Sequence, residues 1–170
     1  FVLNNAMSDF SAAVGALTSQ GLTYGSANAI QGGKTPLSSM SPSIVMKDGK
    51  PFLSVGAAGG PRIITSTLQL IINAIDYGMM MDSAVKSPHM CCLTLDQGLE
   101  LEEGFSPDTI RILKERGHKI KETSDFGVLL VLPNGIENLD GAFFPGGTSR
   151  VDGGGGVLTE SGAICIDGFC

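Results

Sequence analysis

Positive charge is scarce in this chain of 170 residues. Lys and Arg total 11 against 17 Asp and Glu, which gives a formal net charge of −6. The basic residues form no cluster along the sequence. Binding to nucleic acid needs concentrated positive charge that neutralises phosphates. The sequence therefore argues against nucleic acid as a partner.

Long apolar runs are also absent. A membrane-spanning helix needs about 20 consecutive apolar residues, and no run in the sequence approaches that length. A content of 42% hydrophobic and 16% charged residues is instead typical of one globular domain or a piece of a larger one. Residues 1–3 show neither an initiator methionine nor a signal-peptide pattern and are typical of a strand interior, so we expect a fragment or a processed product.

Histidine and cysteine are few, with two and four residues respectively. Cys91 and Cys92 are adjacent, and Cys165 and Cys170 lie near the C-terminus, a pattern that predicts no disulfide framework. His89 precedes the adjacent cysteines, but a second pair of ligands at a familiar spacing is missing. We therefore expect no metal site and interpret Cys91 and Cys92 as small buried apolar residues.

One long helix is predicted after Pro61, which suits the first helical position. Gly78 suits its C-terminal end. Apolar side chains recur there every three or four residues and so share one helix face; they are Ile64, Leu68, Ile71, Ile72, Ile75 and Met79.

The other predicted elements alternate between short strands and helices. Lys47-Asp48-Gly49-Lys50 between two apolar runs predicts a hairpin, and Ser106-Pro107-Asp108 predicts the start of a helix that ends at Gly117. Residues 8–35 are expected to form a long ordered loop. Further expectations are a helical turn at 82–86, strands at 89–95, 99–101, 119–121, 127–132 and 136–143, and a turn at Asn134-Gly135. This mixed order predicts an α+β domain on an antiparallel sheet.

Residues 56–62, Gly-Ala-Ala-Gly-Gly-Pro-Arg, connect a predicted strand to the first helix. They lack both the Lys-Ser/Thr of a phosphate loop and the spacing of a dinucleotide site. Two interpretations stay open. The glycines either only permit a tight turn, or they form an anion or oxyanion site at a helix N-terminus. Because Pro61 has no N–H, Gly59 and Gly60 would supply the donors in the second case.

Ser38 and Ser39 stand in a loop bounded by Pro36 and Pro42. Adjacent serines often serve only as turn caps, but prolines restrict this loop, so its hydroxyls could bind a carboxylate with little further loss of entropy. A nucleophilic serine is disfavoured because neither histidine stands at a recognisable spacing. Asp9 is either a turn residue or a partner for a substrate ammonium, and the second role would complement the serines if the substrate were an amino acid.

Several blocks of the chain resemble the small, C-terminal subunit of the γ-glutamyltranspeptidase (glutathione hydrolase) family. The most specific are Pro-Leu-Ser-Ser-Met-Ser-Pro at residues 36–42 and Gly-Gly-Pro-Arg-Ile at residues 59–63. Leu-Asn-Asn-Ala-Met-Ser-Asp-Phe at 3–10 and Asn-Ala at 28–29 agree as well. The likeness covers about residues 1–157, which we expect to be a partial small-subunit domain. Residues 158–170 stay an unassigned tail, compatible with disorder.

The resemblance implies a fragment of a four-layer αββα sandwich with antiparallel sheets, the fold of the N-terminal-nucleophile hydrolases. In that family a precursor cleaves itself, and the freed threonine attacks the γ-glutamyl amide of a donor such as glutathione. The acyl group then passes to water, an amino acid or a peptide, without a metal or organic cofactor. The implied partner is the large subunit of the same precursor, and relatives are often periplasmic or secreted. By position, Ser38 and Ser39 would hold the α-carboxylate, Asp9 the α-ammonium, and Gly59 and Gly60 the oxyanion.

Two departures from the family pattern matter. The nucleophilic threonine would precede Phe1, and no internal threonine can replace a residue that uses its own α-amine as base, so the chain alone is predicted to be inactive. Ala6 stands where the family usually has a polar side chain near the substrate ammonium. A same-fold acylase, a relative that processes poly-γ-glutamate and a non-catalytic relative therefore stay open as alternatives.

Overall fold

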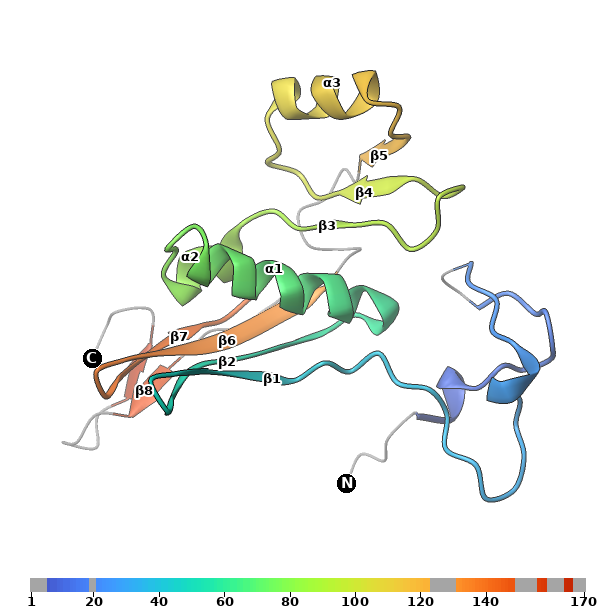
Figure 1. Cartoon of the computed structure of the whole chain (residues 1–170), viewed down its shortest axis with the longest axis horizontal. Coiled ribbons are helices and arrows are strands. Elements are labelled where there is room, and N and C mark those ends of the chain that lie inside the picture. Colours follow the sequence, from blue (N-terminus) through green and yellow to red (C-terminus); the bar gives the residue numbers. More distant parts are fainter. Residues whose placement is uncertain (1–5, 19–20, 123–130, 149–155, 159–163, 167–170) are drawn as a thin grey trace. The chain divides into compact units, whose positions relative to one another are not determined.

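A computed structural model describes residues 6–18, 21–122, 131–148, 156–158 and 164–166 of the chain. The chain divides into two compact units, Phe1–Ser39 and Met40–Cys170. Figure 1 labels the α-helices and most of the strands of the larger unit. The strand end expected at residues 1–3 and most of the strand expected at 127–132 lie outside the described residues.

The N-terminal unit is built from turns and two short 3-10 helices, η1 (Ala6–Asp9) and η2 (Ser26–Asn28). A parallel bridge joins Ser11 to Ala29. Phe10 and Ser11 are buried and anchor the end of η1. The expectation of an ordered loop without regular strands or α-helices agrees with the described part of this segment.

The larger unit contains a four-stranded antiparallel sheet in the order β1-β2-β6-β7. The strands are β1 (Ser43–Lys47), β2 (Lys50–Ala58), β6 (Leu132–Leu139) and β7 (Ala142–Gly146). The hairpin predicted between β1 and β2 is confirmed. Its turn residues Asp48 and Gly49 have φ of 51° and 76°, both in the left-handed region that tight hairpin turns use.

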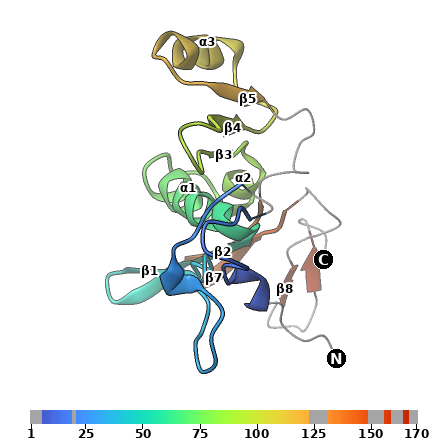
Figure 2. The ribbon, with the colours of Figure 1, turned by 90° about the vertical axis from the view of Figure 1, so that its right-hand side faces the viewer.

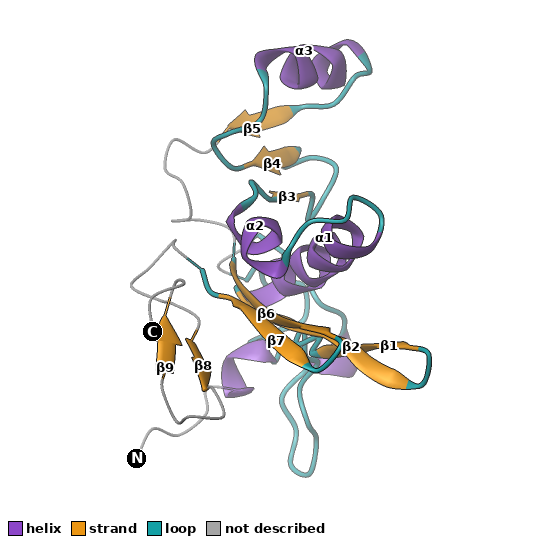
Figure 3. Cartoon of the chain, turned by 90° about the vertical axis from the view of Figure 1, so that its left-hand side faces the viewer, coloured by secondary structure: helices purple, strands orange, loops and turns teal. Residues whose placement is uncertain are grey.

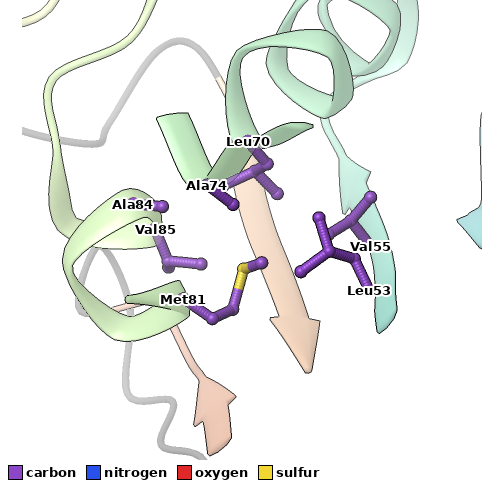
Figure 4. Packing of buried hydrophobic residues seen from close by; sticks show 7 residues of the cluster. All are labelled: Leu53, Val55, Leu70, Ala74, Met81, Ala84 and Val85. Atoms are coloured by element: carbon purple, nitrogen blue, oxygen red, sulfur yellow. The ribbon is translucent and has the colours of Figure 1, made fainter. Parts of the chain in front are cut away.

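Two helices, α1 (Ile63–Ile75) and α2 (Met81–Lys86), cover one face of this sheet, as Figure 3 shows. Side chains of a strand alternate between its two faces, so Leu53 and Val55 of β2 both point toward the helices. They form the core with Leu70, Ala74, Met81, Ala84 and Val85, which Figure 4 shows from close by.

The face of α1 that packs on the sheet agrees only in part with the apolar face that the sequence predicts, since Ile71 and Met79 pack against the core. The helix itself is confirmed, but Ile64, Leu68 and Ile75 are exposed. The buried positions of α1 include Ser66 and Ala74 instead. Leu70 and Ala74 are the α1 residues in the core, and periodicity alone does not reveal this face because α1 carries apolar residues on both sides.

A second, three-stranded sheet lies on the other side of α1, as Figure 2 shows. It contains β3 (Met90–Cys91), β4 (Leu99–Leu101) and β5 (Ile120–Glu122), in that order. Here β4 and β5 run parallel, whereas the sequence predicts antiparallel sheets. The reason is the crossover helix α3 (Pro107–Glu115), which lets the chain return in the same direction. The predicted cap of α3 is confirmed, since the Thr109 N–H donates to the Ser106 Oγ over 3.1 Å.

Two features of the C-terminal half differ from the sequence predictions. β6 runs straight through Asn134 and Gly135, so the turn expected there is wrong, and the hairpin instead turns at Asp140 and Gly141, with φ of 53° and 93°. Gly135 is needed for packing, because a Cβ there would lie 2.5 Å from the Met81 Sδ. Strands β8 (Gly156–Leu158) and β9 (Ile164–Ile166) pair where the sequence assigned no element.

The face of the four-stranded sheet opposite the helices is apolar and exposed. Ile44, Ile136 and Phe143 are 67%, 43% and 56% exposed. Their neighbours on each strand point the other way, toward α1 and α2. The α+β class is confirmed, and a sheet with helices on one face and apolar side chains on the other is half of a layered sandwich.

Candidate active site

Asp9 is the last residue of η1 and is exposed. The chain directly after it is anchored, because Phe10 and Ser11 are buried and the Ser11 N–H donates to the Asn28 carbonyl over 3.0 Å. Because the two residues after Asp9 are buried, the backbone that carries the exposed Asp9 carboxylate is fixed in place. Asp9 and Lys34 are the only charged residues among positions 1–39, so Asp9 is the one acid that this unit can offer to a cation.

Ser38 and Ser39 lie at the end of the same unit. Ser38 is exposed, and Ser39 and Pro36 are half-buried. The loop is held one residue before the serines, where the Leu37 N–H donates to the Asn28 Oδ1 over 3.0 Å. An exposed serine such as Ser38, on a loop fixed in this way, can present its hydroxyl to a carboxylate.

Asn28 is a further residue of this region whose side chain bonds to backbone on both sides of it. Its Nδ2 donates to the Asp9 carbonyl over 2.7 Å, while its Oδ1 accepts from Leu37. The side chain therefore links the backbone at Asp9 with the backbone that leads into Ser38. Asn28 stands in the Asn-Ala block that resembles the family, which was the signal available in the sequence, but its partners are 19 and 9 residues away.

Gly59 and Gly60 lie in the other unit, where β2 passes into α1. Both are exposed, with φ of 150° and 62°, conformations that residues with a side chain rarely adopt. Gly60 opens a 3-10 turn, η3 (Gly60–Arg62), and the Ile63 N–H at the start of α1 donates to the Gly60 carbonyl. The amides of a helix N-terminus carry partial positive charge, which suits this turn to an oxyanion.

Arg62 fixes the end of this turn to the second sheet. Its Nε and Nη2 donate to the two carboxylate oxygens of Glu100 over 2.8 and 3.0 Å, and the two side chains are only 15% and 5% exposed. A bidentate pair of this kind is geometrically specific. The Lys121 Nζ donates to the same carboxylate over 3.1 Å.

The ion pair changes the titration of both partners. The hydrogen bond to Glu100 raises the pKa of Arg62 above its usual value. Burial alone would raise the pKa of Glu100, but the hydrogen bonds from Arg62 and Lys121 outweigh burial, so its pKa lies below the usual value. The pair is therefore charged across the neutral range.

His89, Cys91 and Cys92 do not assemble into a metal site in the part of the chain that the structure describes, where no group of three His, Cys, Asp or Glu residues could hold an ion. The side chains of His89 and Glu102 are buried together, with 3.7 Å between Nδ1 and Oε2, and the His89 N–H donates to the same oxygen over 2.8 Å. Burial raises the pKa of the Cys91 thiol. Cys92 is exposed, so the expectation of a buried residue is wrong there.

None of the helices among the described residues has the length and apolar character needed to cross a bilayer.

Known proteins resemble the chain in both sequence and structure. The sequence model of the gamma-glutamyltranspeptidase family matches residues 1–143. The glutathione hydrolase proenzyme of Escherichia coli is 49% identical over 119 residues, which are 70% of this chain and 20% of that protein. The glutathione hydrolase proenzyme of Bacillus subtilis is 37% identical over 142 residues, which are 84% of this chain and 22% of that protein. The chain thus spans about a fifth of the length of these relatives.

The crystal structure of the T380A mutant of Helicobacter pylori gamma-glutamyltranspeptidase superposes with a TM-score of 0.80. Sequence identity in this superposition is 40%, and it covers 89% of this chain and 82% of that one. The fold is accordingly part of an N-terminal-nucleophile hydrolase. Within that class, the chain belongs to the γ-glutamyltranspeptidase family.

Proposed function

We propose that the chain is the small-subunit part of a glutathione hydrolase that cleaves γ-glutamyl amides. Asp9 binds the α-ammonium of the glutamyl group, Ser38 and Ser39 bind its α-carboxylate, and the amides of Gly59 and Gly60 stabilise the oxyanion. These roles complement one another, because an amino acid headgroup carries an ammonium and a carboxylate on one carbon. Asp9 is matched to the first of these groups in charge, and the two serine hydroxyls are matched to the second as donors.

In the proposed reaction, the hydroxyl of a threonine outside residues 1–170 attacks the γ-carbonyl carbon of the donor. The free α-amine of that threonine takes the hydroxyl proton and later passes it to the leaving amine. The carbonyl oxygen becomes an oxyanion in the transition state, and the Gly59 and Gly60 amides are the preorganised donors. Water or an amino acid then displaces the acyl group from the threonine.

The observation that carries this proposal is the link between Asp9 and the serine loop in one compact unit. Asp9 is exposed, and Asn28 connects its backbone to Leu37, the neighbour of Ser38. Family membership supports the same assignment. The proposed partners are the large subunit of the same precursor, a γ-glutamyl donor such as glutathione, and water, an amino acid or a peptide as acceptor.

The test uses the full-length protein that carries this chain, with γ-glutamyl-p-nitroanilide and glutathione as donors. Wild-type protein is expected to release p-nitroaniline and glutamate. A hydrogen bond to a charged group contributes about 1.5–3 kcal/mol, so Ser38→Ala and Asp9→Asn are each expected to lower kcat/KM about tenfold or more. Release of no product by the wild-type protein would contradict the proposed activity.

Matched controls separate substrate contacts from general damage. Ser26 is an exposed serine of the same unit, and Asp76 is an exposed acid at the C-terminal end of α1. Ser26→Ala and Asp76→Asn are expected to keep wild-type kcat/KM. If Ser38→Ala behaves like Ser26→Ala, the carboxylate-binding role of Ser38 is wrong even though the activity stands.

A further inference from the structure

Asn28 uses both halves of its side-chain amide on distant backbone. The Nδ2 donates to the Asp9 carbonyl over 2.7 Å, and the Oδ1 accepts from the Leu37 N–H over 3.0 Å. One partner lies 19 residues before Asn28 and the other 9 residues after it. The two segments are separated along the chain by an irregular stretch, so this planar amide ties together backbone that the sequence places far apart.

The backbone of Asn28 is itself held on both sides. Its N–H donates to the Gly25 carbonyl over 3.1 Å within η2, and its carbonyl accepts from the buried Ser11 over 3.0 Å. Ala29 adds a parallel bridge to Ser11. The amide therefore projects from a fixed point, as a group must if it is to hold two other segments in place.

Asn28 joins the two segments that, in the proposed function, bind the two charged groups of one amino acid headgroup. Asp9 binds the ammonium, and Ser38, next to Leu37, binds the carboxylate. In the substrate these two charges are attached to the same carbon, so their separation is invariant. A site that binds both at once gains affinity only if its own groups keep that separation before binding.

We propose that Asn28 is a positioning residue that sets the spacing between the ammonium-binding and carboxylate-binding groups and thereby makes the site specific for a complete α-amino acid headgroup. Asn28 acts through the backbone of Asp9 and Leu37 and does not touch the substrate. This inference rests on the proposed function. Its distinctive consequence is that loss of Asn28 weakens ligands with both charges far more than ligands with one.

The experiment measures competitive inhibition of γ-glutamyl-p-nitroanilide hydrolysis by three ligands of the full-length enzyme. L-Glutamate carries both charges, glutarate lacks the ammonium, and 4-aminobutyrate lacks the α-carboxylate. In Asn28→Ala, the inhibition constant of glutamate is expected to rise roughly tenfold, the change that corresponds to about one lost hydrogen bond of fixed geometry. The inhibition constants of glutarate and 4-aminobutyrate should change less than about twofold. The ratio of each of these two constants to the inhibition constant of glutamate therefore falls toward one.

Asn138 offers a matched control. It also bridges backbone with both ends of its amide, donating to the Pro51 carbonyl over 3.0 Å and accepting from the Gly141 N–H over 2.9 Å. It lies in the β6–β7 hairpin, far along the chain from any residue with a proposed substrate role. Asn138→Ala is therefore expected to leave both ratios at wild-type values. Asn28→Ser is a second variant for the case in which Asn28→Ala yields no mature enzyme. The serine hydroxyl is too short to reach both partners, so the same comparison applies with a smaller change of the side chain.

The outcomes are distinguishable. A wild-type protein without γ-glutamyl hydrolysis overturns the proposed function, and this inference with it. An active wild type in which Asn28→Ala and Asn28→Ser raise all three inhibition constants by one common factor overturns this inference alone, because uniform weakening is what general damage to the fold produces. A selective rise for glutamate supports it.

Discussion

Replacing Gly60 by alanine tests the oxyanion assignment most directly. Gly60 has a φ of 62°, and a residue with a Cβ costs about 1–2 kcal/mol more than glycine in this left-handed region. We expect the Gly60→Ala backbone to rotate to relieve that strain, which would turn the N–H of residue 60 away from its original direction. If that N–H is one of two donors to the oxyanion, its loss lowers kcat about 100- to 1000-fold, equivalent to about 2.7–4 kcal/mol.

The expected effect falls on kcat rather than on KM. An oxyanion forms only in the transition state, so a donor aimed at it contributes little to binding of the ground state. Steady-state kinetics of the full-length enzyme with γ-glutamyl-p-nitroanilide separate the two constants. Melting temperatures measured in parallel report the cost of strain.

Gly49 provides a control with the same backbone strain and no proposed role. Its φ is 76°, and a Cβ there would meet no atom within 4 Å. Gly49→Ala and Gly60→Ala are expected to lower the melting temperature by similar amounts, while only Gly60→Ala lowers kcat. A wild-type kcat in Gly60→Ala refutes the oxyanion role, and equal losses of kcat in both variants would show that strain alone is responsible.

Two further predictions concern packing and the ion pair beside the turn. Gly135→Ala places a Cβ against Met81, an overpacking expected to cost about 1–3 kcal/mol and to speed amide hydrogen exchange in β6 about five- to 150-fold. Gly32→Ala, with no neighbour within 4 Å of its Cβ, should leave this exchange unchanged. Equal exchange rates in both variants would contradict the packing argument. Because the folded-state pKa of Glu100 lies below its ordinary 4.5, its ion pair with Arg62 contributes stability that is fully present above about pH 4.5 and is lost as the pH falls through the folded-state pKa. Melting temperatures of wild type and Glu100→Gln should therefore differ at neutral pH and converge in acid; a difference that stays constant from pH 7 to pH 3 would argue against this pair.

Local signals in the sequence predicted the elements that depend on local physics. Asp48-Gly49 marks a hairpin because those residues tolerate left-handed backbone, and Ser106 marks a helix start because its hydroxyl accepts from Thr109. The family blocks around Ser38 and Gly60 also stand out in the sequence, because each is a short contiguous segment. These blocks are sufficient to assign the chain to this family.

Three other features depend on partners that are distant along the chain. Gly135 has the local pattern of a turn, but Met81 makes it a glycine required by close packing inside β6. The buried face of α1 was predicted only in part, since Ile71 and Met79 pack against the core but Ile64, Leu68 and Ile75 are exposed. The bidentate pair of Arg62 with Glu100 joins residues 38 positions apart, which no periodicity indicates.

By itself, then, the sequence determined the family, the hairpin, the helices and the segments that carry the proposed site, because short-range backbone preferences and contiguous motifs are written in neighbouring residues. Only the tertiary structure decided which strands pair, which face of α1 is buried, and that Asn28 connects Asp9 to the loop of Ser38. The physical reason is the same in each case. Side-chain packing and long-range hydrogen bonds depend on which distant residues meet, and several arrangements satisfy the local rules equally well until the folded chain selects one.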